Sequence, residues 1–194
     1  MIFKSLLAAA AVLVSSTLLA TTANAELVQV RPNRDTTVYW VGPCNQCVSD
    51  ACRSCNYGKE GQLLIAQQLR VSSSILLNFD IPTDNLGCYL SVPPPLKNGL
   101  LGTGTNFTIN SASADWSETQ VTGENAPAKG ALVAVHTFND SDYQIVDVSD
   151  ACKNGSGASH NVSLYLSIQT PANAYARYNS NENNSEISLF VEKR

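Results

Sequence analysis

The sequence predicts an all-β protein, a jelly-roll β-sandwich of two antiparallel sheets with long loops and a short helical turn. About ten short segments rich in β-branched and aromatic residues follow one another, and glycine or proline separates many of them. Several segments alternate apolar and polar residues, which is typical of strands with one buried face. Behind a leader of 25 residues, 169 of the 194 residues remain. This length favours a two-sheet jelly roll over a smaller immunoglobulin-type sandwich.

The first 25 residues have the features of a secretory signal peptide. Lys4 supplies a positive charge, residues 6–14 are apolar, and Ala23-Asn24-Ala25 is a small-residue cleavage site. The apolar stretch is too short to span a bilayer, and no later segment is long or apolar enough. We expect a signal peptide at 1–25, one β-sandwich domain at 26–194, and a secreted, extracellular protein that is free or held at a cell wall or cell surface.

The first half of the domain contains five expected strands. Residues 56–82 are read as a turn and a hairpin that breaks at Pro82, and Leu86 to Val92 alternates apolar and polar positions. Three consecutive prolines end that last strand. The expected strands cover residues 27–30, 35–41, 63–66, 74–80 and 86–92.

The second half is expected to add strands around a long irregular excursion at 111–129. Residues 147–152 are read as a helical turn that Asp147 or Ser149 can cap. In the closing strand, Ile187, Leu189 and Val191 share one face. The expected strands cover residues 105–109, 131–138, 143–146, 162–168 and 187–191.

Six cysteines in an exported chain predict disulfides. Cys88 and Cys152 are expected to form a long-range pair. The other four lie close together and are expected to form two bonds of unknown connectivity: Cys44, Cys47, Cys52 and Cys55. A zinc site is the alternative for these four, but the gap between the two CxxC pairs is shorter than zinc sites normally have.

Charge and sequons indicate the surroundings of the protein. The formal net charge is −4, with 12 Lys and Arg and no basic run, which gives no indication of a nucleic-acid partner. Five Asn-x-Ser/Thr sequons are candidate glycosylation sites: Asn106, Asn139, Asn154, Asn161 and Asn183.

Catalytic motifs are absent from the sequence, which contains two histidines and neither a GxSxG elbow nor an HExxH motif. No pair of carboxylates stands out for glycoside hydrolysis. No cofactor is expected apart from a structural calcium ion, for which four carboxylates are weak candidates. They are Asp35, Asp80, Asp147 and Asp150, and turn or cap carboxylates are the alternative reading.

Six motifs in order resemble the DNRLRE domain, also called carbohydrate-binding module family 96 and related to disaggregatase-associated repeats. They read DTTVY from residue 35, NYG with LLI from 56, SILLNFD from 74, WSETQVT from 116, VDVSD from 146, and SNENN before SLFV from 180. The resemblance covers about Asp35 to Val191. Asn78 replaces a basic residue of the family pattern, and Gly123 lies near the place of its second Trp. The resemblance implies a jelly-roll module that binds polysaccharide.

Aromatic side chains are the candidates for sugar stacking, since an indole or phenol ring packs against the apolar face of a pyranose. Neighbours on a strand face opposite sides, so one of Tyr39 and Trp40 is expected at the surface. Trp116 is either a platform or the anchor of the long loop. Tyr175, Arg177 and Tyr178 form a second candidate group, with Tyr175 and Arg177 on one face.

The function expected from these observations is non-catalytic binding of a polysaccharide or cell-wall glycan, without a membrane span. The main alternative is a structural or adhesive protein that uses the same fold to contact extracellular-matrix or cell-surface proteins. A small polysaccharide lyase or hydrolase is the third.

Overall fold

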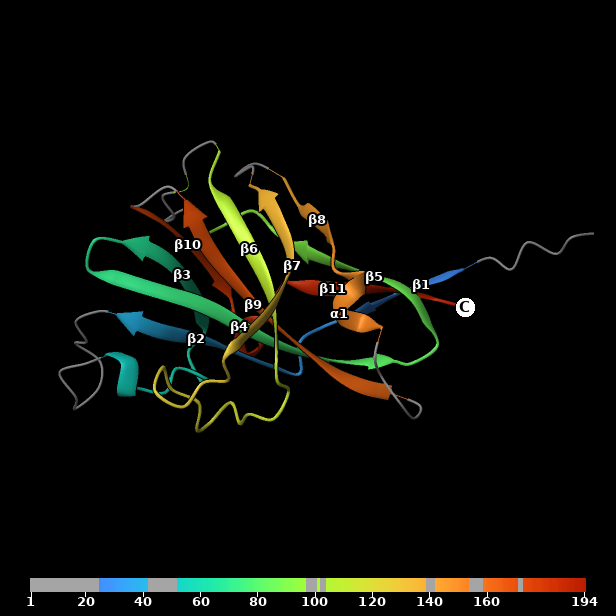
Figure 1. Cartoon of the computed structure of the whole chain (residues 1–194), viewed down its shortest axis with the longest axis horizontal. Helices are drawn as coiled ribbons and strands as arrows, with labels where there is room; N and C mark the ends of the chain where they lie inside the picture. Colours follow the sequence, from blue (N-terminus) through green and yellow to red (C-terminus); the bar gives the residue numbers. More distant parts are fainter. Residues whose placement is uncertain are drawn as a thin grey trace, which may run out of the picture.

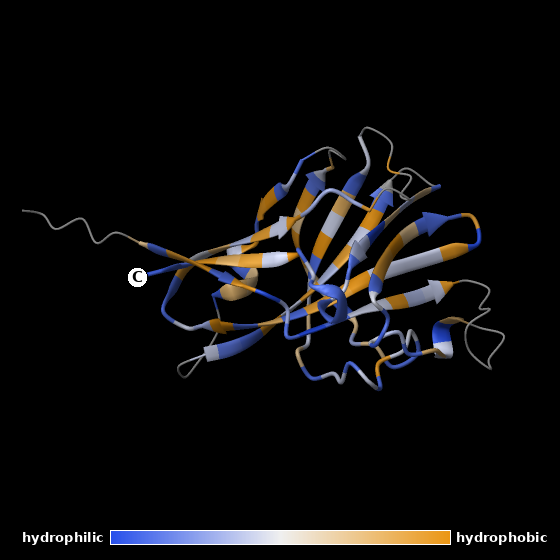
Figure 2. Cartoon of the chain, turned by 180° about the vertical axis from the view of Figure 1, so that it is seen from behind, coloured by the Kyte–Doolittle hydropathy of each residue, from blue (hydrophilic) through white to orange (hydrophobic). Residues whose placement is uncertain are grey.

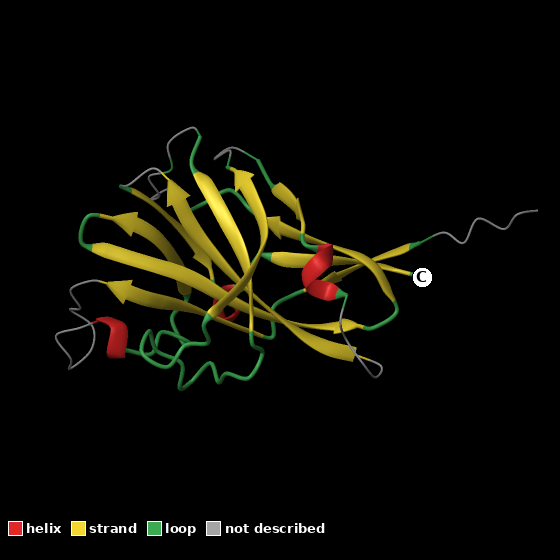
Figure 3. Cartoon of the chain, viewed as in Figure 1, coloured by secondary structure: helices red, strands yellow, loops and turns green. Residues whose placement is uncertain are grey.

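Two antiparallel β-sheets make up almost all of the regular structure. The computed structural model describes residues 25–41, 52–96, 101, 104–138, 142–153, 159–170 and 173–194. These ranges contain eleven strands in a four-stranded and a seven-stranded sheet (Figures 1 and 3). The predicted all-β sandwich of two antiparallel sheets is therefore confirmed. Residues 1–24 of the predicted signal peptide lie outside the described ranges.

The smaller sheet joins strands from both ends of the chain. Its order is β1 (Glu26–Val30), β11 (Ser188–Lys193), β5 (Asn85–Val92) and β8 (Gln144–Asp147). The closing strand β11 lies between β1 and β5, so Val191 pairs with Val28 on one side and with Cys88 on the other.

The larger sheet is centred on the 12-residue strand β4, which pairs with β2, β3 and β9. Its order is β10 (Ala174–Asn179), β3 (Gln62–Gln68), β4 (Val71–Pro82), β9 (Ser159–Thr170), β6 (Asn106–Ala112) and β7 (Lys129–Thr137), with β2 (Arg34–Val41) also paired to β4.

Strand β10 was not among the expected strands. Its sequence, AYARYN, has no β-branched residue, and pairing with β3 over its full length holds it extended. Strand β6 continues to Ala112 and β7 starts at Lys129, so the irregular excursion is confined to 113–128. Local composition cannot reveal these pairings, because the partner strands are distant in sequence.

The main core lies between the sheets. Alternate residues of β4, β9 and β11 point inward, and Leu77, Leu164 and Leu189 are all 0% exposed. Figure 2 shows bands of hydrophobic and hydrophilic residues along the strands of both sheets. Each such leucine contributes about 1.5–3 kcal/mol relative to full exposure.

A second, smaller cluster attaches the excursion at 113–128 to the larger sheet. Trp116 is 7% exposed and packs with Val38, Leu76, Val121 and Tyr165. Its indole Nε1 donates to Ser163 Oγ at 3.0 Å. Trp116 is therefore a loop anchor, and its buried ring is not placed to act as a sugar platform.

Gly123 explains a departure from the family pattern. A Cβ at this position would lie 1.9 Å from the carbonyl oxygen of Tyr39. Such a distance is far inside van der Waals contact, so no side chain fits where the excursion passes β2. The tryptophan of the pattern therefore has no room at this residue.

The pair Cys88–Cys152 forms a disulfide, as predicted. It links β5 to α1 (Ser149–Cys152), which is shorter than the predicted turn at 147–152. Asp147 ends β8, and its Oδ1 accepts a hydrogen bond from the Ser149 backbone N–H at 2.9 Å. The Ser149 hydroxyl and this backbone bond lower the pKa of Asp147.

No helix in the described part of the chain has both the length and the apolar character needed to cross a membrane.

Candidate functional site

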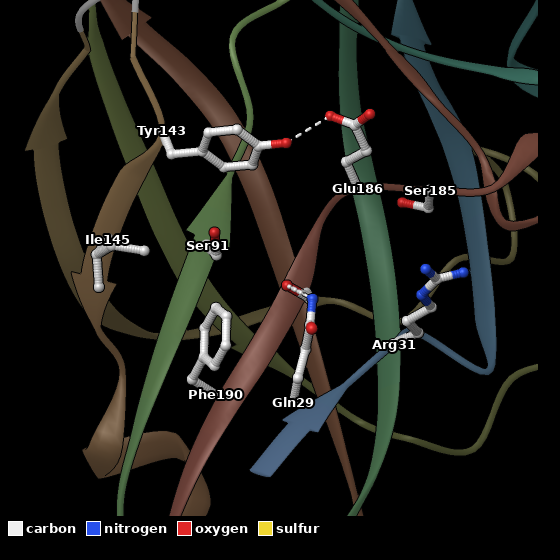
Figure 4. A pocket seen from close by; sticks show the side chains of 9 residues that line it. Gln29, Arg31, Ser91, Tyr143, Ile145, Ser185, Glu186 and Phe190 are labelled. Carbon is white, nitrogen blue, oxygen red and sulfur yellow. Dashed lines mark hydrogen bonds between the residues drawn. The ribbon is translucent and has the colours of Figure 1, made fainter. Parts of the chain in front are cut away.

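An open groove crosses the solvent-facing side of the four-stranded sheet (Figure 4). Its volume is about 470 Å³, within the range of roughly 300–1,000 Å³ that is usual for ligand sites. Nine residues of the described part of the chain line it: Gln29, Arg31, Ser91, Tyr143, Ile145, Ser185, Glu186, Ser188 and Phe190.

Strand register brings these residues together from distant parts of the sequence. Phe190 of β11 pairs with Gln29 of β1, and Ser188 pairs with Ser91 of β5, which pairs with Ile145 of β8. Because side chains alternate along a strand, the burial of Leu189 and Val191 in the core turns Ser188 and Phe190 outward.

The apolar part of the groove consists of Phe190, Tyr143 and Ile145. Phe190 is half-buried in the middle of the sheet, whereas Tyr143 and Ile145 are 53% and 54% exposed. Figure 4 shows the Tyr143 ring extending across the groove from the segment before β8. Two rings separated by polar groups suit a ligand with both apolar faces and hydroxyl groups.

The polar part is fixed by two hydrogen bonds. Tyr143 donates its hydroxyl to Glu186 Oε2 at 2.6 Å, and Gln29 Nε2 donates to Ser188 Oγ at 3.1 Å. The bond to the Glu186 carboxylate raises the pKa of Tyr143, because losing the phenol proton would put two negative groups in contact. Arg31 is exposed at the opposite end of the groove in Figure 4.

This chemistry supports binding more readily than bond cleavage. Glu186 is the single carboxylate among the nine lining residues, whereas glycoside hydrolysis usually requires a pair of carboxyl groups. The groove offers a cationic donor in Arg31, an anionic acceptor in Glu186 and the neutral amide of Gln29, arranged around the ring of Phe190.

Tyr39 and Arg177, two of the residues predicted from sequence, lie together in another pocket. It has a volume of about 130 Å³, and six further residues line it: Thr37, Tyr57, Glu60, Gln62, Leu63 and Leu64. We call it the β2–β3 pocket. Tyr175 shares a strand face with Arg177, as predicted, but does not line this pocket.

Trp40 belongs to a packed cluster on the larger sheet. Lys129 Nζ lies 5.5 Å from the Trp40 ring centroid and 5.6 Å from that of Tyr165, and it donates to Ser167 Oγ at 2.7 Å. Partial burial lowers the pKa of Lys129. The Trp40 indole donates to Ser74 Oγ at 3.0 Å. The ring is therefore half-buried and engaged by neighbours.

Tyr178 cannot take the predicted role of a surface platform. Its side chain is 1% exposed and belongs to the main core. The reason is alternation along β10, since Ala174, Ala176 and Tyr178 face inward while Tyr175 and Arg177 face the other way.

The four candidate calcium ligands have different surroundings. Asp35 is 1% exposed, whereas Asp80, Asp147 and Asp150 are exposed. Asp150 pairs with Lys153 at 2.6 Å. Within the described ranges, no group of three or more His, Cys, Asp or Glu side chains is arranged to hold a metal ion.

Three of the five sequons fall on described residues. Asn161 and Asn183 are exposed, and Asn106 is half-buried and accepts a hydrogen bond from Thr137. Asn139 and Asn154 lie outside the described residues, as do Cys44 and Cys47. Cys52 and Cys55 are buried, and Cys55 is disulfide-bonded.

The groove itself was not predicted from sequence. The signal was present in the closing strand, because Ile187, Leu189 and Val191 on one face leave Ser188 and Phe190 on the other. What the sequence did not reveal was the position of β11 between β1 and β5, which places Gln29 beside Phe190.

Comparison with known proteins identifies relatives. An uncharacterized secreted protein of Arthroderma benhamiae (strain ATCC MYA-4681 / CBS 112371) is 28% identical over 131 residues. The match covers 65% of this chain and 66% of that protein, slightly less than two thirds of the relative's length. The model of carbohydrate-binding module family 96 matches residues 44–193, which include seven of the nine groove residues. This match spans more than half of the chain, which therefore belongs to carbohydrate-binding module family 96.

Proposed function

We propose that this protein is a secreted, non-catalytic module that binds polysaccharide in the groove of the four-stranded sheet. The observation that carries the proposal is the combination of Phe190 and Tyr143 with Gln29, Arg31 and Glu186 in one open groove. Membership of a carbohydrate-binding family supports the ligand class. The relative described as a secreted protein supports the location.

The ligand is expected to contact the groove in two ways. The apolar face of one sugar ring stacks on Phe190 or Tyr143, which removes apolar C–H surface from water. Hydroxyl groups at the ring edge bind the Gln29 amide, the Arg31 guanidinium and the Glu186 carboxylate, which together supply donors and acceptors. Because the groove is open, it suits an internal stretch of a glycan chain.

The test is retention on insoluble polysaccharides and on a glycan array. Phe190→Ala and Tyr143→Ala are each expected to weaken binding about fivefold or more, because stacking on an aromatic side chain contributes roughly 1–3 kcal/mol for nucleic-acid bases and about 1.4 kcal/mol corresponds to tenfold. Leu69→Ala is the matched control, since Leu69 is 91% exposed and outside the groove. Normal retention of both aromatic variants, with their fold intact by circular dichroism, would contradict the proposal.

Strand β7 favours a second candidate function, assembly with other proteins. It pairs with β6 and carries two exposed apolar residues, Leu132 at 58% and Val135 at 52%. Unpaired strand edges can pair with another chain. If the protein retained no glycan but self-associated in a manner that Val135→Lys abolished, a structural or adhesive role would replace glycan binding.

A further inference from the structure

We infer that the β2–β3 pocket is a second binding site, which takes a single sugar ring from a chain end or a branch. This inference rests on the proposed function, because it assumes a glycan ligand. The pocket has no residue in common with the groove. It is formed by β2, β3 and β10 of the larger sheet and the segment before β3, whereas the groove belongs to the smaller sheet.

The frame of the pocket is held by strand pairing and by one side-chain bond. Arg177 of β10 pairs with Leu64 of β3, and Thr37 Oγ1 of β2 accepts a hydrogen bond from the Leu64 backbone N–H at 2.8 Å. Thr37 is 5% exposed. Three strands that meet at Leu64 therefore fix the walls before any ligand arrives, which limits the ordering cost of binding.

The inner wall of the pocket is aromatic. The ring centroids of Tyr39 and Tyr57 lie 4.6 Å apart, with an angle of 42° between the rings. Tyr57 is 6% exposed and supports Tyr39, which is half-buried. A supported ring of this kind offers apolar contact surface to a sugar while losing little conformational freedom.

The remaining polar wall carries three side chains with complementary hydrogen-bonding roles. Glu60 accepts, Arg177 donates, and the Gln62 amide does both. Glu60, Gln62 and Arg177 are exposed, and none of their side chains bonds to another residue of the described part of the chain. Their polar atoms are thus available for the hydroxyl groups of a sugar.

Size separates the two sites. The pocket volume of about 130 Å³ is well below the roughly 300 Å³ at the lower end of the usual ligand-site range, so the pocket suits one ring. The groove, at about 470 Å³, suits a longer stretch. A module with two such sites can hold two glycan chains at once, or one chain twice, and both arrangements raise avidity.

The experiment measures free monosaccharides and polysaccharide cross-linking separately. Chemical-shift titrations use glucose, galactose, mannose and N-acetylglucosamine as probes. Wild type is expected to bind one of them. Arg177→Ala is expected to weaken that binding at least tenfold, since hydrogen bonds to charged groups contribute about 1.5–3 kcal/mol, and Gln62→Ala about twofold or more, since neutral hydrogen bonds contribute about 0.5–1.5 kcal/mol. Arg70→Ala is the control, because Arg70 is exposed and outside both sites.

Cross-linking is measured as turbidity of a soluble polysaccharide that wild type binds. Arg177→Ala is expected to bind this polysaccharide but to produce no turbidity, whereas Arg70→Ala behaves like wild type. Unchanged monosaccharide affinity and turbidity in both Arg177→Ala and Gln62→Ala would overturn the second site. That result leaves the proposed function standing, since the groove is tested by Phe190→Ala and Tyr143→Ala.

Discussion

Burial of Asp35 predicts an unusual dependence of stability on pH. Its carboxylate is 1% exposed. Oδ2 accepts a hydrogen bond from the Asn181 backbone N–H at 2.7 Å, while Oδ1 is buried with no partner among the described residues. The pKa of Asp35 is raised to about 7 from 3.8, mainly by burial and further by the charges of Glu182 and Glu118. The folded protein therefore binds a proton that the unfolded chain has already released.

The size of the effect follows from this difference in pKa. One pKa unit corresponds to about 1.36 kcal/mol, so a rise from 3.8 to about 7 amounts to roughly 4 kcal/mol. Below pH 3.8 both states hold the proton and the full contribution of the neutral acid is present. Between pH 3.8 and 7 the folded state holds more protons than the unfolded state, so the free energy of unfolding falls as pH rises. Above pH 7 this contribution is lost.

The perturbation is Asp35→Asn, which keeps the shape of the side chain and an acceptor for the Asn181 N–H. Urea unfolding of wild type and variant at pH 4, 5.5, 7 and 8.5 gives the free energy of unfolding of each. We expect the variant to gain up to about 4 kcal/mol relative to wild type between pH 4 and 8.5.

The comparison isolates Asp35 from Glu118, whose pKa is also raised, mainly by burial. Glu118 is present in both proteins, so its own titration largely cancels in the difference. Parallel curves, with a constant difference between variant and wild type at all four pH values, would refute the reasoning that Asp35 is buried and protonated near neutral pH.

Three further predictions follow from the fold. Replacing both Cys88 and Cys152 by serine should lower the free energy of unfolding by about 4 kcal/mol in the chain-entropy model, measured by urea unfolding, because the bridge spans a sequence separation of 64 residues; an unchanged midpoint would contradict this. Gly123→Ala should lower the melting temperature markedly because of its clash with the Tyr39 carbonyl, whereas Gly61→Ala, whose Cβ would meet Asn183 at 3.5 Å, should have a much smaller effect; equal shifts would be evidence against the close approach. EDTA should leave the melting temperature unchanged, because the described carboxylates do not converge on a metal site. If EDTA lowered the melting temperature, calcium restored it and the Asp35→Asn variant showed no such effect, a cation would instead be placed at Asp35.

Much of the fold could be predicted because period-2 alternation directly reports which residues face the core. Alternation places Leu86, Cys88, Leu90 and Val92 on one face, and the last three are buried, whereas Leu86 at the start of β5 is 47% exposed. The Cys88–Cys152 pair followed from compartment and cysteine count. Strand β10 could not be predicted, because pairing with β3, rather than the preferences of its own residues, keeps it extended.

The candidate sites were less predictable than the fold. Aromatic residues in the sequence divide into packed and exposed ones only once the sheets are formed, so Trp116 and Tyr178 are buried while Tyr143 is 53% exposed. Tyr39 and Arg177 are separate candidates in the sequence, and they line one pocket because β10 pairs with β3, which is hydrogen-bonded to Thr37 of β2. Alternation along β11 indicates that Phe190 faces outward. The groove beside Phe190, however, is formed by residues of the neighbouring strands in the sheet.

Isothermal titration of a soluble polysaccharide into wild type and the Phe190→Ala/Tyr143→Ala double variant tests the proposed groove most directly. The polysaccharide is one that wild type retains in the array. We predict saturable binding to wild type and to Leu69→Ala, and binding to the folded double variant that is weaker by about thirtyfold or more, since two stacking contacts of roughly 1–3 kcal/mol each are lost. Equal affinity for the double variant and wild type would contradict the assignment of the groove as the polysaccharide site.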